Sequence, residues 1–426
     1  MAGAIYSCPF TILSPCKHFS YRNFSLGLKE FEAVCKRHTS SIHSSIVNSV
    51  FKDRLPAFQR DPCGRRFSCA FTGRVRHSSG KWNLSLFKKC YRFSTYSHTE
   101  KTQIDPHALT ETHLSQLCEA IKKELNSSIK PLRDVSQYYF DGQGKYIRPM
   151  MVLLTAEACN SHTSNSRKIL PSQSTVVMVS EMIHTASLVH DDVIDGADTR
   201  RGKTSINKMF GERMSVLAAD YILACASQTL AKLGNSEVVE LLAKVVDDLV
   251  KGEFMQLGSK ENPDERFNHY LEKTYKKTAS LIACCCKAVA VFGNCDPEVQ
   301  EIAFQYGRNI GMAFQVVDDI LDFVASEGEM GKPTATDLRL GLATAPVLFA
   351  CEQFPDLNAL IMRRFKGPND VDEAREAVDK SDGIARSYTL ASQYAKEAVK
   401  QINKLSSSPQ RDALVTLTQQ IIQRRK

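Results

Sequence analysis

From about Asp105 to the end of the chain, apolar residues recur at intervals of three and four, the spacing that places them on one face of an α-helix. Short interruptions rich in Gly, Asp or Pro separate these stretches, and no strand-like alternation of useful length or repeat of fixed period is present. The pattern predicts an all-α domain of roughly 330 residues, long enough that further helices must wrap a central set. The expected helical stretches are Leu114–Leu125, Met150–Ala158, Val176–Val189, Ser215–Leu233, Val238–Leu257, Tyr270–Val291, Val299–Phe323, Pro346–Phe354 and Tyr388–Leu405.

The first hundred residues have a different composition. Residues 1–99 contain 16 Lys and Arg against 4 Asp and Glu, whereas the rest contains 39 against 43. A basic, acid-poor segment without periodicity is typical of a mitochondrial transit peptide, and a basic tail that stays attached is the alternative. We therefore divide the chain into residues 1–96, a transit peptide and disordered basic segment, and residues 97–426, the folded domain. Because the positive charge is confined to the first part, we expect no nucleic-acid partner.

Neither cysteine chemistry nor a membrane span is indicated. Six of the 14 cysteines lie before residue 97, and the other eight include the run Cys284–Cys286 without the paired spacing of a zinc site. We interpret that run as small side chains filling a helical core, in a reducing compartment. No run of eighteen apolar residues exists, so we expect no transmembrane segment, although peripheral membrane contact stays open.

A first acidic motif lies in Leu188–Asp195. Asp191 and Asp195 are four residues apart, so both carboxylates project from one helix face and repel each other unless a cation lies between them. Oxygen ligands at this spacing suit Mg²⁺, which also binds substrate phosphates. We expect Asp192 to point elsewhere and to orient or hydrate the site. A similar pair, Asp247–Asp248, is followed by Lys251 where the motif has its third aspartate, and it is interpreted as a solvated face.

A second copy of this acidic motif supports the interpretation of the first as a metal site. Phe314–Phe323 places Asp318, Asp319 and Asp322 in an otherwise apolar helical stretch, where acids are costly unless they are paired or bind metal. Two copies that face one cavity are able to hold several Mg²⁺ ions around a diphosphate.

Cations that suit a diphosphate accompany the first motif. Arg200 and Arg201 follow it closely, and guanidinium groups bind phosphate oxygens in a bidentate way. Upstream, Lys145 and Arg148 lie three residues apart just before Pro149, a residue favoured at a helix start. Singly, each would be taken for a surface charge; with the two acidic motifs they indicate a diphosphate site.

With these motifs the chain resembles the trans-isoprenyl diphosphate synthase family, over about residues 135 to 350. Besides the acidic motifs, the resemblance rests on Tyr138–Lys145, Glu181–Asp192, Gly252–Ser259 and Gly331–Pro333. It implies one multi-helix bundle of the isoprenoid synthase type around a central apolar cavity. The implied activity is trans-prenyl transfer: isopentenyl diphosphate condenses onto an allylic diphosphate of the farnesyl or geranylgeranyl type. The greatest similarity is to the long-chain synthases of the decaprenyl type, which make the ubiquinone side-chain precursor. The resemblance implies a mitochondrial enzyme on the matrix side, with peripheral contact to the inner membrane left open. It also implies a hetero-oligomer, a heterotetramer, with a homologous second subunit.

The resemblance also implies roles for single residues. Catalytic aspartates would be Asp191, Asp192, Asp195, Asp318, Asp319 and Asp322, with Asp191, Asp195 and Asp318 holding Mg²⁺ on the allylic diphosphate. Arg200 would bind that diphosphate as well. The diphosphate of isopentenyl diphosphate would be bound by Lys145, Arg148, His184 and Arg201. The reacting centre and the leaving diphosphate would be met by Lys277, Thr278, Gln315 and Lys332.

Two positions concern specificity. Many relatives have Lys in a Gly-Lys-Ala-Thr phrase where this chain has Leu342, so this part of the site has less positive charge. Ala186 and Ser187, five and four residues before Asp191, lie near its helix face and are small, which predicts a long product because a bulky side chain there would block a growing chain.

Two other functions share part of this pattern. A class I terpene cyclase would share the bundle but normally replaces the second motif with a mixed Asn, Ser and Glu site. A non-catalytic subunit would be expected to have lost motif aspartates, and all six are present. A catalytic subunit that acts only with its partner remains open.

Overall fold

The computed structural model describes residues 104–142, 144–200, 202–258, 262–324 and 335–424. All of them belong to one compact unit, Ser97–Lys426. Residues 1–96 lie outside the described residues, so their assignment as a transit peptide stays a prediction. Arg201 and Lys332, both predicted to bind diphosphate, lie outside them as well.

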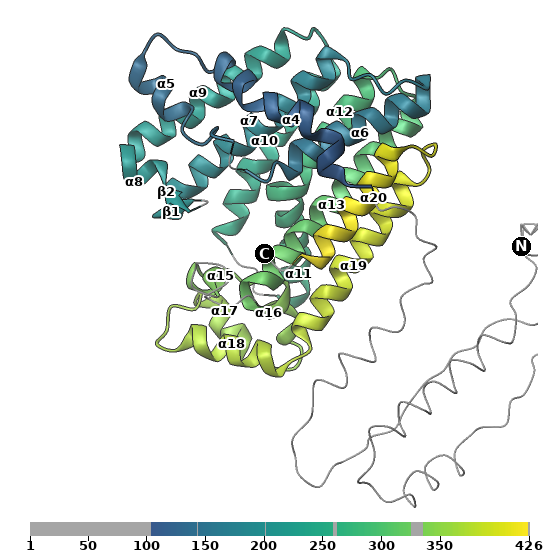
Figure 1. The fold of residues 1–426 in the computed structure, drawn as a ribbon. Coiled ribbons are helices and arrows are strands. Elements are labelled where there is room, and N and C mark those ends of the chain that lie inside the picture. Colours follow the sequence, from purple (N-terminus) through teal and green to yellow (C-terminus); the bar gives the residue numbers. More distant parts are fainter. Residues whose placement is uncertain (1–103, 143, 201, 259–261, 325–334, 425–426) are drawn as a thin grey trace, which may run out of the picture. The chain divides into compact units, whose positions relative to one another are not determined.

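The described residues are mostly helical, as predicted (Figure 1). The helices are α4 (Pro106–Glu124), α5 (Lys130–Ser136), α6 (Ile147–Ser164), α7 (Pro171–Ile194), α8 (Ile206–Phe210), α9 (Glu212–Ala231), α10 (Ser236–Gln256), α11 (Pro263–Thr274), the π-helix η2 (Tyr275–Ala279), α12 (Ser280–Phe292), α13 (Pro297–Val324), α15 (Thr336–Arg339), α16 (Ala345–Ala350), α17 (Leu357–Met362), α18 (Asp370–Lys380), α19 (Gly383–Ile402) and α20 (Pro409–Gln423). Two-residue strands β1 (Thr199–Arg200) and β2 (Lys203–Thr204) form an antiparallel ribbon.

Local sequence explains where several helices begin. The Asp105 side chain accepts a hydrogen bond from the amide of His107 at 3.0 Å, and Pro106 occupies the first turn, where it lacks no needed donor. The side chain of Ser408 caps α20 in the same way, at 3.2 Å from the amide of Arg411. Helices α5, α8, α15, α17, α18 and α20 were not among those predicted from the sequence.

Two glycines set how closely α13 approaches η2 and α12. A Cβ atom added at Gly307 would lie 2.7 Å from the Cα of Ala283, and one added at Gly311 would lie 2.6 Å from the Cα of Ala279. Any side chain at either position would push the helices apart. Gly307 and Gly311 therefore allow η2 and α12 to pack closely against α13, the helix that holds the second acidic motif.

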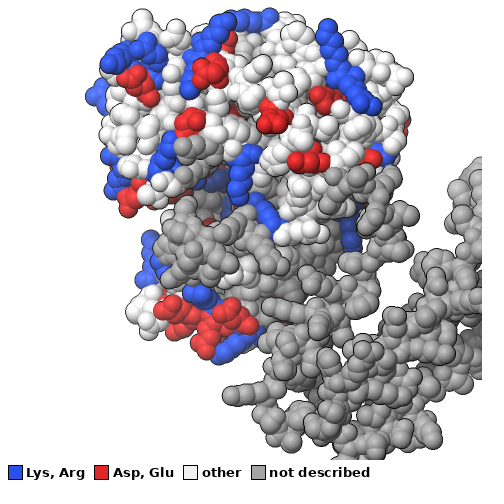
Figure 2. All heavy atoms as spheres, viewed as in Figure 1, with Lys and Arg blue, Asp and Glu red and all other residues white. Residues whose placement is uncertain are grey.

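Figure 1 shows α19 and α20 alongside α13, and the short helices α15–α18 gathered near one end of it. The main core includes buried side chains of α6, α7, α9, α12 and α13, and a second cluster lies around the end of α13 and α16–α18. Cys284, Cys285 and Cys286 are buried in the main core, which confirms their interpretation as core residues. On the face in Figure 2, basic and acidic side chains are interspersed over the described surface.

Helix α9 bears on the expectation that nothing spans a membrane. Its length and mean hydropathy are sufficient for a helix that spans a membrane, although 44% of its most apolar 18-residue segment is buried inside the protein. Ala218, Ala219 and Ile222 of this helix pack in the main core. Core helices meet the same two criteria, so α9 is weak evidence for a span.

Candidate functional site

The first motif lies where α7 ends. Asp191 is in the last turn, its side chain 28% exposed, and Asp195 is the residue that caps the helix. Burial raises the pKa of Asp191 to about 6, and the nearby carboxylates of Glu253 and Asp195 add to this, while Lys277 opposes it. Among the side chains that the structure describes, the nearest cation is the Nζ atom of Lys277, 4.0 Å from the Asp191 carboxylate. Negative charge at this helix end is therefore only partly compensated, a setting in which a divalent cation would be stabilised.

Asp192 faces the interior and is fully buried. Its Oδ1 atom accepts a hydrogen bond from Nε of Arg200 at 2.8 Å, and its Oδ2 atom accepts one from the Tyr139 hydroxyl at 2.9 Å. That hydroxyl also accepts from the amide of Ile206 at 3.2 Å. Asp192 thus orients Arg200 on the β1–β2 ribbon. Tyr139 was not predicted to act here, because a tyrosine before an apolar helix is usually an ordinary core residue.

The three aspartates of the second motif have different surroundings on α13. Asp318 is partly exposed and its Oδ1 atom lies 2.5 Å from Nη2 of Arg424. Asp319 is buried and accepts hydrogen bonds from the Tyr270 hydroxyl at 2.6 Å and from Nε2 of Gln315 at 2.8 Å. Burial raises its pKa to about 6. Of these two aspartates, Asp318 is the one that is partly open to a ligand.

Asp322 has a local structural partner. Its two carboxylate oxygens accept hydrogen bonds from the amides of Thr336 and Asp337, each at 3.0 Å, at the start of α15. Asp337, which was not among the predicted site residues, is half-buried beside this motif. Burial and the nearby Asp319 and Asp322 raise its pKa well above the usual range.

Two arginines meet at the ring of Phe314. The guanidinium carbon of Arg148 lies 5.3 Å from the ring centroid, and that of Arg424 lies 4.1 Å from it. Arg148 also lies 3.0 Å from Nε2 of His184 on α7. The structure therefore brings the predicted pair Arg148 and His184 together and adds Arg424 from the end of the chain. Burial raises the pKa of Asp318, and Arg424, Arg148 and the exposed Lys145 oppose this rise.

The π-helix η2 connects the two motifs. Lys277 is hydrogen-bonded to Glu253, which lies on α10, and reaches toward Asp191 on α7. The hydroxyl of the next residue, Thr278, donates to Oε1 of Gln315 at 2.8 Å, and Gln315 in turn donates to Asp319. A single turn of chain thus contacts the first motif through one side chain and the second through the next. Such π-turns occur often at functional sites.

The residues predicted to set product length lie on the core side of α7. Ala186 is fully buried, and the half-buried Ser187 donates a hydrogen bond to the carbonyl of His184 at 2.8 Å. Their effect on the product stays a prediction.

The neutral residue Leu342 lines a small pocket with Tyr270 and Lys273. Burial lowers the pKa of Lys273, which faces the carboxylates of Asp319 and Asp337. In this part of the site the cation comes from α11.

The described residues contain no group of three His, Cys, Asp or Glu side chains close enough to hold a metal ion by themselves. Mg²⁺ commonly takes one or two carboxylates and completes its shell with water and substrate phosphates. Asp191 and Asp195, partly exposed and short of positive charge, fit that kind of site.

Comparisons with known proteins agree on one family. The model of the family described as polyprenyl synthetase matches residues 129–380, which include both acidic motifs. The all trans-polyprenyl-diphosphate synthase PDSS1 of Homo sapiens is 56% identical over 330 residues, covering 78% of this chain and 80% of that protein. The decaprenyl-diphosphate synthase subunit 1 of Schizosaccharomyces pombe is 41% identical over 378 residues, covering 83% and 98%.

A solved structure gives the same result. The polyprenyl synthase of Caulobacter crescentus, complexed with calcium and isoprenyl diphosphate, superimposes with a TM-score of 0.68 at 28% identity and covers 75% of this chain and 97% of its own. The fold similarity extends over nearly all of the described residues, and the predicted all-α architecture is confirmed.

Proposed function

The chain belongs to the polyprenyl synthetase family and is a long-chain trans-polyprenyl diphosphate synthase, and from this premise we propose how its residues act. The reaction breaks the bond between the allylic carbon and its diphosphate, joins that carbon to the double bond of isopentenyl diphosphate and releases a proton. Preorganised cations stabilise the charge that develops on the leaving diphosphate. The proton goes to the released diphosphate, and the apolar helical interior keeps water from the cationic carbon skeleton.

We assign the divalent cations as Mg²⁺, of which several would be held by Asp191, Asp195 and Asp318. When bound, they would supply electrophilic assistance to the departure of diphosphate. The raised pKa of Asp191, with no cation nearer than 4.0 Å among the described side chains, supports this assignment. The calcium in the Caulobacter crescentus structure is in keeping with it.

The two diphosphates have separate sets of residues. Arg200, oriented by Asp192, and Lys277, oriented by Glu253, would bind the allylic diphosphate together with Lys332. Arg148, His184 and Lys145 would bind isopentenyl diphosphate with Arg201. The contact between Arg148 and His184 supports the second set.

The observation that carries this proposal is the connection made by η2. Lys277 faces Asp191, and Thr278 reaches Asp319 through Gln315, so one turn is in contact with both acidic motifs. A diphosphate between the motifs would be within reach of both.

We further propose a mitochondrial enzyme that makes the ubiquinone side-chain precursor on the matrix side, with a homologous second subunit. The similarity to a decaprenyl-diphosphate synthase subunit 1 supports the partner, and the basic composition of residues 1–99 supports the location. Peripheral contact with the inner membrane belongs to this proposal.

The test is a condensation assay on the full-length chain, alone and with its homologous subunit, using farnesyl diphosphate and labelled isopentenyl diphosphate with Mg²⁺. We expect long polyprenyl products that disappear when Mg²⁺ is chelated. Turnover only with the second subunit would keep the chemistry and make the hetero-oligomer obligatory. No turnover in either case would contradict the proposal.

The same assay tests product length. Ala186→Phe adds a ring on the core side of α7 and should shorten the product, as sized by chromatography, because the growing chain meets an obstruction. Unchanged chain length would contradict the role of Ala186 and Ser187.

A further inference from the structure

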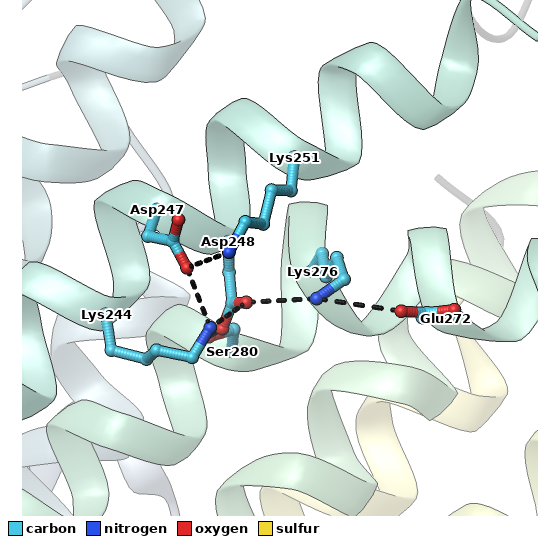
Figure 3. A network of polar contacts seen from close by, with 7 residues as sticks. All are labelled: Lys244, Asp247, Asp248, Lys251, Glu272, Lys276 and Ser280. Carbon is cyan, nitrogen blue, oxygen red and sulfur yellow. Dashed lines mark hydrogen bonds and ion pairs between the residues drawn. The ribbon is translucent and has the colours of Figure 1, made fainter.

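The pair Asp247–Asp248 on α10 was predicted to be a solvated face, and that is wrong for one of the two. The Asp247 side chain is 42% exposed, whereas that of Asp248 is 3% exposed. Figure 3 shows Asp248 at the centre of a polar network that joins α10 to η2 and α12. Burying a carboxylate costs free energy unless hydrogen bonds and ion pairs offset it, so the partners of Asp248 indicate which parts of the structure it holds in place.

Asp248 has three partners. Its Oδ1 atom accepts hydrogen bonds from Nζ of Lys244 at 2.6 Å and of Lys276 at 3.2 Å, and its Oδ2 atom accepts one from the Ser280 hydroxyl at 2.7 Å. Lys276 lies inside the π-turn and Ser280 is the first residue after it. One carboxylate is therefore bonded to the π-turn and to the residue that follows it.

The π-turn sends neighbouring lysines in different directions. Lys276 points to Asp248, while Lys277 is bonded to Glu253 and to Oε1 of Gln256, the latter at 3.1 Å, and faces Asp191. In a regular α-helix, without the extra residue of the π-turn, the side chains of this segment would point in other directions. The π-turn therefore decides where Lys277 points. The bond between Lys276 and Asp248 holds that turn.

Helix α10 makes a second contact one turn further on. A Cβ atom added at Gly252 would lie 2.6 Å from Cγ of Lys277, so only glycine lets the stem of this lysine cross the helix. Asp248 and Gly252 are four residues apart and therefore lie on one face of α10. That face fixes both lysines of the π-turn.

We propose that Asp248 is a positioning residue for the synthase reaction: it holds the π-turn through Lys276 and Ser280, so that Lys277 and Thr278 are presented to the allylic diphosphate. The inference rests on the proposed roles of Lys277 and Thr278. It assigns Asp248 no contact with substrate, since this carboxylate is 3% exposed and is bonded to Lys244, Lys276 and Ser280.

The chain provides a matched control. Asp248→Asn and Asp247→Asn remove the same charge from adjacent positions of one helix, but only the first loosens the π-turn. In the full-length chain assayed with its homologous subunit, Asp248→Asn should lower kcat/KM for farnesyl diphosphate by about tenfold to a hundredfold, the size expected for a misplaced catalytic contact. Asp247→Asn should stay within about twofold. Equal effects of the two substitutions would overturn the proposal.

A double substitution separates positioning from general stability. In a Lys277→Met background, the further loss of kcat/KM caused by Asp248→Asn should be several-fold smaller than the loss it causes in the wild type, because one of the two side chains that it positions is gone. If the two losses multiply instead, Asp248 acts on the fold as a whole and the proposal is wrong. The Ser280→Ala variant should show a smaller loss of the same kind.

Binding provides a readout that does not depend on turnover. Calorimetric titration of inorganic pyrophosphate in the presence of Mg²⁺ should show weaker binding for Asp248→Asn and unchanged binding for Asp247→Asn. If the wild type condenses no isoprenoids, the proposed function fails while this titration still decides the inference. Equal pyrophosphate affinity in both variants would contradict the positioning role.

Discussion

The two acidic motifs have the same spacing, yet their surroundings match in only part. In each, the middle aspartate is buried and accepts a hydrogen bond from a tyrosine hydroxyl: Tyr139 for Asp192 and Tyr270 for Asp319. In each, the first aspartate is partly exposed and faces a cation. The spacing therefore gives one helix an inward acid that fixes the motif and an outward acid that is available to a ligand.

The difference lies in how far the outward acid is already compensated. Asp318 is ion-paired with Arg424 at 2.5 Å, whereas Asp191 is 4.0 Å from Lys277. The third aspartates differ too, because Asp195 is exposed at the end of α7 and Asp322 caps α15. The first motif is thus arranged for a ligand, whereas the second, in the last turns of α13, also makes structural contacts.

The largest expected effect follows from that difference. Asp191→Ala should reduce kcat/KM by about a thousandfold, because it removes the proposed metal-binding carboxylate whose negative charge is less neutralised by a neighbouring cation. Asp318→Ala should cost less, about a hundredfold, since Arg424 already neutralises part of its charge. Steady-state assays at several Mg²⁺ concentrations would measure both, with Asp247→Ala as the control. Equal losses for the two aspartates would break the comparison.

The tyrosines test the shared part. Tyr139→Phe and Tyr270→Phe each remove one hydrogen bond to a buried carboxylate and should lower the free energy of unfolding by about 1–2 kcal/mol. Each should also lower kcat about tenfold, because Arg200 and Gln315 lose part of their support. Denaturant unfolding and steady-state kinetics would show this. If only one tyrosine mattered, the resemblance between the motifs would be superficial.

Much of this arrangement followed from sequence, and its limits have a physical cause. Periodicity and spacing determine which residues share a helix face, so the helical class and the shared face of Asp191 and Asp195 were within reach, whereas the expectation that Arg148 and His184 act at one site came from the family resemblance. Spacing does not determine which distant residue meets a given face. Arg424 meets Asp318 from 106 positions away, and a tyrosine such as Tyr270 is an ordinary core residue by pattern alone.

The π-turn and Asp248 were missed for a related reason. Tyr270–Val291 has one helical pattern throughout, and an inserted residue inside an apolar run leaves no interruption to detect. Asp248 looked solvated beside Asp247 because adjacent acids in a helix usually are. Its burial depends on Lys276, 28 positions later, which reaches it only after α10 and η2 pack.

Measuring the free energy of unfolding against pH tests how far the negative charge of Asp191 is compensated. The pKa of Asp191 is raised to about 6, so the folded protein binds this proton more tightly than the unfolded chain does. The stability that Asp191 contributes is complete below about pH 4 and is lost as pH rises through about 6. In metal-free protein, Asp191→Asn should therefore raise the free energy of unfolding by about 1–2 kcal/mol at pH 8, with the gain vanishing near pH 4.

Chemical denaturation of both proteins in a chelating buffer would measure this. Asp247, whose pKa is lowered to about 2 by hydrogen bonds from Lys251 and Lys244, provides the control: Asp247→Asn should give no gain at pH 8. A loss of stability on Asp191→Asn at pH 8 would show that this carboxylate is well compensated after all.

The third aspartates give the smallest effect and the most local one. Asp322→Asn replaces a carboxylate that accepts two amide hydrogen bonds at the start of α15 and should lower the free energy of unfolding by about 1 kcal/mol, as for other helix caps. Asp195→Asn replaces an exposed residue at the end of α7 and should change stability by less than about 0.5 kcal/mol. Denaturant midpoints measured in metal-free buffer would compare the two. Equal losses would mean that the carboxylate at the helix end is structural as well, and the division of labour between the motifs would then lie only in their first aspartates.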